Sequence, residues 1–214
     1  MFELNPNPTI TTEPFEDTTI WYIDNFYQNP DEILNYFLAN PPTYFKLNEE
    51  PGYNGKLFQD MRHLLYDDVR HVYEYVANIC GDLAKNREVI TNCFRFLDCE
   101  FNDYQNNYWW PHFDEGHTGI VFFNRDEDSG TNIYRCLESS EDDMRYDTPE
   151  HIAPWRPKDK YELLKSMKPR YNRCILFNAK RYLHGQNIID DRYTDQFRLN
   201  QVLFLDPIIK NNYE

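Results

Sequence analysis

Two short stretches of this sequence carry side chains that could bind one metal ion together. His112 and Asp114 are separated by a single residue, and His184 lies 72 positions after His112. Residues two apart in a β-strand point to the same side of the sheet, so an imidazole and a carboxylate at this spacing can reach one point. The sequence therefore predicts a metal site formed by His112, Asp114 and His184.

Two histidines and one carboxylate leave several coordination positions of a metal open. Such positions allow a bidentate oxo acid and oxygen to bind side by side, which is what oxidative chemistry on Fe(II) requires. The same ligands could hold Zn²⁺ with an activated water, because zinc also accepts histidine and carboxylate ligands. The triad thus indicates a catalytic metal centre without deciding between these two metals.

Arg198 favours the oxidative alternative. It lies 14 positions beyond His184, and an alternating strand would place Arg198 and Asn200 on the same inward face. An arginine inside an apolar barrel is costly unless it is paired, and its planar fork suits a carboxylate. We therefore expect Arg198, with Asn200 beside it, to bind the distal carboxylate of a dicarboxylic cosubstrate, a group that a hydrolase does not need.

The region before residue 90 is expected to support the site with helices. The pattern predicts an extended arm over residues 1–18 and a strand near Ile20–Ile23. A helix is expected to begin at Asn29–Glu32, and a longer one to run from Asp60 to Leu83. A Pro/Gly/Asn-rich loop over 41–56 separates the two helices.

From residue 91 onward the sequence pattern changes to short runs of strand-forming residues separated by turn residues. The predicted strands are Cys93–Phe101, Thr118–Phe123, Thr131–Tyr134, Arg173–Phe177 and Phe197–Leu205. This pattern predicts an α+β fold whose core is a double-stranded β-helix (jelly roll, cupin-like) with flanking N-terminal helices.

We expect residues 1–214 to form a single domain, with a helical support region over 1–90 and a jelly-roll core over 91–214. An insertion over 137–172 interrupts the core. It is charged and poor in strand pattern, and a short helix is predicted over Asp159–Met167. Long insertions between strands tend to be functional. We therefore expect 137–172 and the 41–56 loop to frame the substrate entrance.

In this order and at these spacings, the site residues resemble the Fe(II)/2-oxoglutarate-dependent dioxygenase superfamily, in particular its prolyl-hydroxylase-like branch. The matching pieces are Tyr104 with Trp110-Pro111-His112-Phe113-Asp114, Thr118-Gly119-Ile120-Val121-Phe122-Phe123-Asn124, Ser129-Gly130-Thr131-Asn132, Leu183-His184-Gly185, and Arg198. The resemblance covers residues 104–205. It departs from the family at Ser129, which stands where a glycine is common, and in the 137–172 insertion.

The resemblance implies a hydroxylase that uses Fe(II), oxygen and 2-oxoglutarate, with ascorbate as reductant. Succinate, carbon dioxide and an iron-based oxidant are then formed, and the oxidant removes hydrogen from an unactivated C–H bond. The resemblance also implies a tyrosine on the cosubstrate, for which Tyr104 and Tyr134 are both candidates. Asp114 argues against the related halogenases, which carry a small residue in its place.

Two other classes of protein remain as alternatives. One is a cupin-like hydrolase or isomerase that uses the same three ligands, and Arg198 is the feature that separates it from an oxygenase. The other is a catalytically silent viral jelly-roll module. The intact triad argues against that class, because a purely structural domain has no reason to direct three ligands at one point.

The overall composition and charge exclude some classes of binding partner. A formal net charge of -14 and a pI near 4.8 disfavour nucleic acid and anionic membranes. The sequence contains no apolar run long enough to span a membrane and no secretion signal. Its five cysteines lack paired spacing, which indicates free thiols in a reducing compartment, the cytoplasm. The expected partners are oxygen and a small-molecule or protein substrate, for which the sequence carries no signature.

Overall fold

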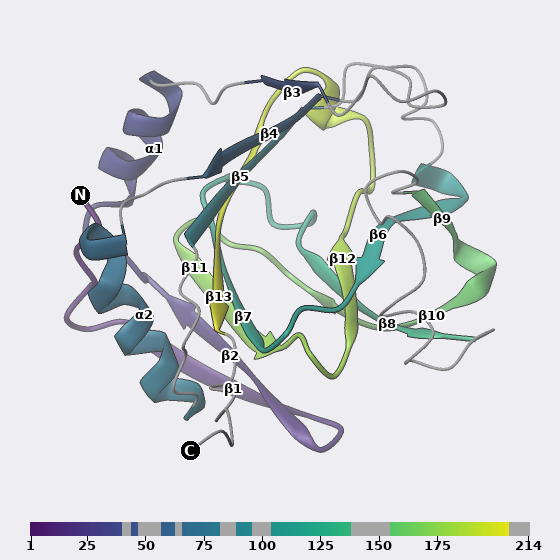
Figure 1. Cartoon of the computed structure of the whole chain (residues 1–214), viewed down its shortest axis with the longest axis horizontal. Helices are drawn as coiled ribbons and strands as arrows, with labels where there is room; N and C mark the ends of the chain where they lie inside the picture. Colours follow the sequence, from purple (N-terminus) through teal and green to yellow (C-terminus); the bar gives the residue numbers. More distant parts are fainter. Residues whose placement is uncertain are drawn as a thin grey trace, which may run out of the picture.

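Two antiparallel sheets face each other in the computed structural model, which describes residues 1–39, 44–46, 57–62, 66–81, 89–95, 104–137 and 155–205 (Figure 1). In order across the large sheet, the strands are β1 (Thr9–Phe15), β2 (Thr18–Asp24), β11 (Arg173–Asn178), β7 (His117–Phe122), β13 (Arg198–Leu205), β5 (Val89–Arg95), β4 (Leu57–Arg62) and β3 (Tyr44–Lys46). The small sheet consists of β10 (Tyr161–Met167), β8 (Thr131–Cys136), β12 (Leu183–Gln186), β6 (Asn107–His112) and β9 (Trp155–Pro157).

The chain passes back and forth between the sheets. Strands β5, β7, β11 and β13 lie together in the large sheet, while β6, β8, β10 and β12 lie together in the small one. This alternation is the double-stranded β-helix, so the predicted fold class is confirmed.

Apolar side chains from both sheets fill the space between them. Ile120 and Phe122 of β7 point inward and pack with Phe177 of β11 and Ile133 of β8. The intervening residue Val121 points to the opposite face of the large sheet, as strand alternation requires. This alternation also decides which residues of β7 and β13 face the interior of the barrel.

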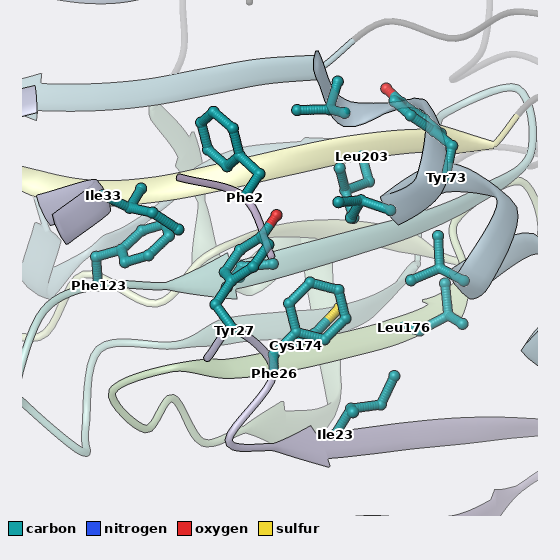
Figure 2. Close-up of a cluster of buried hydrophobic side chains, with 14 of the residues drawn as sticks. Phe2, Ile23, Phe26, Tyr27, Ile33, Tyr73, Phe123, Cys174, Leu176 and Leu203 are labelled. Carbon is teal, nitrogen blue, oxygen red and sulfur yellow. The ribbon is translucent and has the colours of Figure 1, made fainter. Parts of the chain in front are cut away.

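Two helices cover the outer face of the large sheet (Figures 1 and 2). Helix α1 (Pro30–Ala39) begins at a proline, which suits the first helical position, and has two acidic residues in its first turn. Its buried residues Ile33 and Phe37 are one turn apart. Helix α2 (Tyr66–Cys80) buries Val69, Val72, Tyr73 and Val76 against the same cluster. The helices therefore pack on the face of the large sheet that lies opposite the barrel interior, into which Arg198 points.

The region 1–90 contributes strands to the large sheet in addition to the helices that the pattern predicts. The arm over 1–18 contains β1, which forms a hairpin with β2 and widens the large sheet. The helix predicted from Asp60 is wrong at its start, because Asp60 belongs to β4 and helix α2 begins at Tyr66. Strand β4 is paired with β5 along its whole length, so tertiary pairing overrides the local helical period. Most of the 41–56 loop lies outside the described residues.

The segment 137–172 also differs from the prediction. A single 3₁₀ turn (Lys158–Lys160) and strand β10 replace the helix expected over Asp159–Met167. Strand β10 pairs with β8, and a register shift between Leu163 and Lys165 breaks its alternation. This irregularity hides the strand from a period-two pattern. Residues 138–154 lie outside the described part of the chain, so their expected role at the entrance stays a prediction.

Among the described helices, neither is long and apolar enough to cross a membrane. Cys80, Cys136 and Cys174 are free thiols, as predicted for this part of the chain. The side chains of Cys93 and Cys99 lie outside the described residues.

Candidate metal centre

The structure brings His112, Asp114 and His184 together at one end of the barrel. Each offers a ligand atom, and these atoms all lie within 4.8 Å of one another. Nε2 of His112 lies 3.7 Å from Oδ1 of Asp114, and Nε2 of His184 lies 3.3 Å from Oδ2. His112 ends β6 and pairs directly with His184 on β12, so the sheet register places the two imidazoles face to face.

A β-bulge in β6 shapes the backbone before His112. His184 pairs with His112 but Gln186 pairs with Trp109, so β6 contains one extra residue between these pairs. Trp110 has a φ of 47°, in the left-handed region, and Pro111 follows it. A bulge is a place where a strand tolerates proline, which has no N–H for the ladder. The sequence Trp110-Pro111 therefore encodes the irregularity that sets up the first ligand.

Backbone carbonyls orient both imidazoles. Nδ1 of His112 donates to the carbonyl of Trp110 at 2.7 Å, and Nδ1 of His184 faces the carbonyl of Tyr182 at 3.4 Å. A proton on Nδ1 leaves the lone pair on Nε2, which is the form that binds a metal. In both histidines Nε2 is the nitrogen that faces Asp114.

Gly185 allows the two histidine strands to approach each other. A Cβ at this position would lie 2.4 Å from the carbonyl oxygen of Trp109 and 3.0 Å from that of Trp110. Both distances are shorter than van der Waals contact, so any side chain here would push β12 away from β6. The glycine after His184 is thus a requirement of the site geometry.

Asp114 lies just beyond the end of β6 and is held by two contacts. Its backbone N–H donates to the carbonyl of Ala179 at 3.1 Å, and the hydroxyl of Thr118 donates to its Oδ2. Burial by itself would raise the pKa of this carboxyl, but His184, His112 and the Thr118 hydroxyl outweigh burial and lower it to about 2. Asp114 is therefore a carboxylate at neutral pH, as a metal ligand must be.

A cavity joins the triad to Arg198. It has about 400 Å³ of empty space and opens to solvent. Its lining comes from both sheets: His112, Asp114, Thr118, Ile120, Thr131, His184, Gly185, Gln186, Arg198, Asn200, Val202 and Phe204. The predicted pair Arg198 and Asn200 thus share the inward face of β13, as expected.

The register of β7 and β13 orders the cavity along its length. Thr118, next to the triad, pairs with Phe204, and Ile120 pairs with Val202. Arg198 lies at the far end, with its guanidinium carbon 5.6 Å from the centre of the Phe122 ring. The cavity is therefore polar at both ends and apolar between them.

Arg198 is a buried cation. Its Nη2 donates to the carbonyls of Gly130 at 3.0 Å and Ser129 at 3.4 Å. Burial lowers the pKa of the guanidinium, and Tyr193 and Asp126 oppose that shift. Arginine nevertheless keeps its charge in proteins, so the inner end of the cavity is positively charged.

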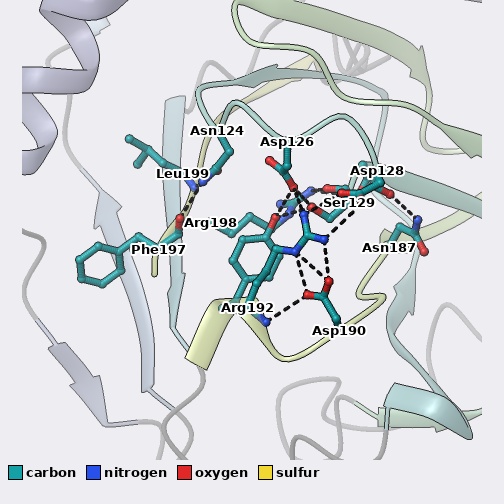
Figure 3. Close-up of polar contacts among 12 residues, drawn as sticks. Asn124, Asp126, Asp128, Ser129, Asn187, Asp190, Arg192, Phe197, Arg198 and Leu199 are labelled. Carbon is teal, nitrogen blue, oxygen red and sulfur yellow. Dashed lines mark hydrogen bonds and ion pairs between the residues drawn. The ribbon is translucent and has the colours of Figure 1, made fainter. Parts of the chain in front are cut away.

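A polar network fixes the surroundings of Arg198 (Figure 3). The Tyr193 hydroxyl donates to Asp126 at 2.8 Å and also contacts the Ser129 hydroxyl. Arg192 binds Asp190 at 2.6 Å and Asp128 at 2.7 Å. These bonds connect the segment before β13 to the segment before β8, whose carbonyls hold Arg198. None of these network residues except Arg198 and Ser129 belongs to a motif recognised in the sequence.

Two further polar residues of the cavity were not predicted as site residues, although Thr131 lies in one of the stretches that resemble the dioxygenase superfamily. Thr131 and Gln186 pair across β8 and β12, and both line the cavity. Thr131 Oγ1 and Gln186 Oε1 are buried and have no hydrogen-bond partner among the described residues. A polar ligand would satisfy them. For Gln186, the position two residues after His184 is the one available sequence signal.

The two candidate tyrosines lie away from the cavity. Tyr134 alternates with the inward-pointing Ile133 and packs on the other face of the small sheet with Tyr161 and Leu183. Tyr104 packs against a cluster around Trp109. Neither lines the cavity, so the expected tyrosine contact with the cosubstrate is not supported by their positions.

The comparisons with known proteins agree with this architecture. No family model and no curated protein sequence matches this chain. Among solved structures, the epimerase SnoN in complex with Fe³⁺, alpha-ketoglutarate and nogalamycin RO matches with a TM-score of 0.52 and 13% identity, over 87% of this chain and 78% of that chain. This chain shares the fold of SnoN.

Two other solved structures match at lower TM-scores. One is a second structure of the non-haem alpha-ketoglutarate-dependent epimerase SnoN, with a TM-score of 0.49 and 14% identity over 87% of this chain and 76% of that chain. The other is an oxidoreductase of the 2OG-Fe(II) oxygenase family from Burkholderia pseudomallei, with a TM-score of 0.46 and 10% identity over 84% of this chain and 78% of that chain.

Proposed function

We propose that this protein is an Fe(II)- and 2-oxoglutarate-dependent oxygenase that acts on a small molecule or a protein side chain. One observation carries the proposal: a single cavity joins a His/Asp/His triad at one end to a buried arginine at the other. A metal hydrolase needs the three metal ligands, but its reaction does not require a buried arginine that binds a carboxylate. The shared fold with SnoN, an epimerase that binds Fe³⁺ and alpha-ketoglutarate, is compatible with this function.

The donor set fits iron. His112, His184 and Asp114 would hold the ion through two Nε2 atoms and a carboxylate oxygen, which is the ligand set of non-haem Fe(II) oxygenases. Bound iron, together with a 2-oxo acid and oxygen, supplies the oxidising power for removing hydrogen from a C–H bond. The protein residues would hold the ion and leave part of its coordination sphere open, and Ile120, Val202 and Phe204 line the same cavity.

The rest of the cavity fits 2-oxoglutarate. Arg198 would bind the distal carboxylate. The hydroxyl of Thr131 lies in the same cavity, has no hydrogen-bond partner among the described residues and could donate to that carboxylate. Ile120 and Val202 lie between the two polar ends, where the two methylene groups of the oxo acid would pack. A charge-assisted hydrogen bond contributes roughly 1.5–3 kcal/mol, so Arg198 would contribute strongly to binding.

The test begins without oxygen. Purified protein is titrated with Fe(II) and then with 2-oxoglutarate, and the absorption of the chelate is followed in the visible range. Oxygen is then added with ascorbate, and succinate is measured by mass spectrometry. We expect a chelate band and slow succinate formation, which a true substrate would accelerate. Asp114→Ala is the control and should show neither signal.

Two outcomes decide against the proposal. One is the absence of succinate above the Asp114→Ala control. The other is hydrolysis of an ester or amide by the zinc-loaded protein, which would support the rival cupin-like class. Once a substrate is found, reaction under ¹⁸O₂ separates hydroxylation from epimerisation, because only a hydroxylated product retains an oxygen atom from O₂.

A further inference from the structure

Thr118 lies on the opposite side of the barrel from the two histidines and contacts the third ligand. His112 and His184 come from β6 and β12 of the small sheet, whereas Thr118 belongs to β7 of the large sheet. Its side chain is buried, lines the cavity and donates its hydroxyl hydrogen to Oδ2 of Asp114. This bond spans the gap between the two sheets at the level of the triad.

The three ligands differ in how they are held. Each histidine lies on a paired strand and has its second ring nitrogen directed at a backbone carbonyl two residues earlier. Asp114 instead follows the end of β6, and its backbone N–H donates to the carbonyl of Ala179. The rotation of its carboxylate therefore depends on what its side-chain oxygens bind, and Thr118 engages one of them.

The choice between one-oxygen and two-oxygen binding matters for a metal with this ligand set. A carboxylate that binds through both oxygens takes up one more coordination position than a carboxylate that binds through one. A 2-oxo acid needs two adjacent open positions and oxygen needs another. A hydroxyl that holds one carboxylate oxygen disfavours the two-oxygen mode and so preserves the open positions.

We propose that Thr118 is a positioning residue that orients Asp114 and keeps it a one-oxygen metal ligand. The inference rests on the proposed metal site. Partners of this kind behind a metal ligand typically change metal affinity by about 10–100-fold when they are removed.

The experiment compares Thr118→Val with Thr118→Ser in the full chain. Valine keeps the shape and the methyl group but lacks the hydroxyl, whereas serine keeps the hydroxyl and lacks the methyl. Mn(II) and Co(II) affinities are measured in the absence of oxo acid, and the visible spectrum of the Co(II) protein reports the coordination. Thr19→Val on β2, which does not line the cavity, serves as the same substitution elsewhere in the chain, and its affinity for the metal should match the wild type.

We expect Thr118→Val to bind metal about 10–100-fold more weakly and to change the Co(II) spectrum, and Thr118→Ser to restore both. Wild-type affinity and spectrum in Thr118→Val would overturn the role of Thr118 while leaving the metal site intact. Equal losses in the valine and serine variants would also overturn it, because the methyl group and not the hydroxyl would then matter. If the wild type binds no metal, the proposed function fails together with this inference.

Discussion

His112 and His184 face each other across directly paired strands, with their ring centres 4.3 Å apart. This relationship depends on Gly185, since a Cβ there would lie 2.4 Å from the Trp109 carbonyl oxygen. We expect Gly185→Ala to separate β12 from β6, to weaken metal binding strongly and to lower the free energy of unfolding by about 1–3 kcal/mol. Metal titration and urea denaturation test this.

Gly119→Ala is a matched control on β7. A Cβ there would meet Leu203 at 3.4 Å, an ordinary contact. This variant should retain its affinity for metal. The reason given for Gly185 is wrong if both alanine variants bind metal equally well.

Arg198 should determine the affinity for 2-oxoglutarate but not for metal. Arg198→Met removes the charge and the planar fork at the inner end of the cavity. We expect the dissociation constant for 2-oxoglutarate to rise by about 10–100-fold, which corresponds to the 1.5–3 kcal/mol of a charge-assisted bond. Arg198→Lys keeps the charge without the fork and should lose less. Calorimetry on the Mn(II) protein measures both variants, and loss of Mn(II) binding would contradict the assignment.

Tyr193 should support Arg198 from behind. Its hydroxyl contacts Ser129 and Asp126 beside the guanidinium. Tyr193→Phe removes these contacts, so we expect 2-oxoglutarate affinity to fall by about 2–10-fold, the effect of one ordinary hydrogen bond, with metal affinity unchanged. Tyr22→Phe is the control, because the Tyr22 hydroxyl binds Glu13 away from the cavity. An unchanged dissociation constant for 2-oxoglutarate in Tyr193→Phe would show that this network does not contribute to cosubstrate binding.

The pair Asp24–Arg173 predicts a pH-dependent part of the stability. Arg173 binds both carboxylate oxygens, at 2.6 and 2.8 Å, and these bonds lower the pKa of Asp24. The contribution to stability is therefore complete above the unfolded pKa of about 3.9 and is lost as the pH falls through the lower folded pKa. Arg173→Met should cost about 1.5–3 kcal/mol at pH 7.

Urea denaturation at several pH values tests this contribution. The difference between Arg173→Met and the wild type should shrink below about pH 4. Arg170→Met is the control, because Arg170 makes one contact of 3.1 Å with Asp24 and 53% of its side chain is exposed. Its effect should stay below about 1 kcal/mol at every pH. A pH-independent difference for Arg173→Met would show that lost packing, not the ion pair, causes the destabilisation.

The sequence alone determined the fold class, the triad and the position of Arg198. Strand alternation relates residues two apart, so Arg198 and Asn200 could be assigned to one face of β13 without coordinates. The same rule brought His112 and Asp114 together in the prediction, although Asp114 lies just beyond the end of β6 and reaches the site from the following turn. The helix that begins at Pro30 could also be predicted from the sequence, because its start signals and its buried residues lie within a few positions of one another. The pair Arg198 and Asn200 and the helix share one property: the residues that define each of them are close together in the chain. His184 was assigned to the site by its residue type and its place in the sequence order, and its contact with the other two ligands required the structure.

Only the tertiary structure decided what depends on contacts between distant segments. Thr118 reaches Asp114 through the packing of one sheet on the other, and Thr131 faces Gln186 through the register of β8 and β12. The same reason explains the errors at β4 and β10, where pairing with a neighbouring strand outweighs local pattern. The face that Tyr134 occupies was likewise decided by the structure, because a one-residue difference along a strand moves a side chain to the opposite face of the sheet.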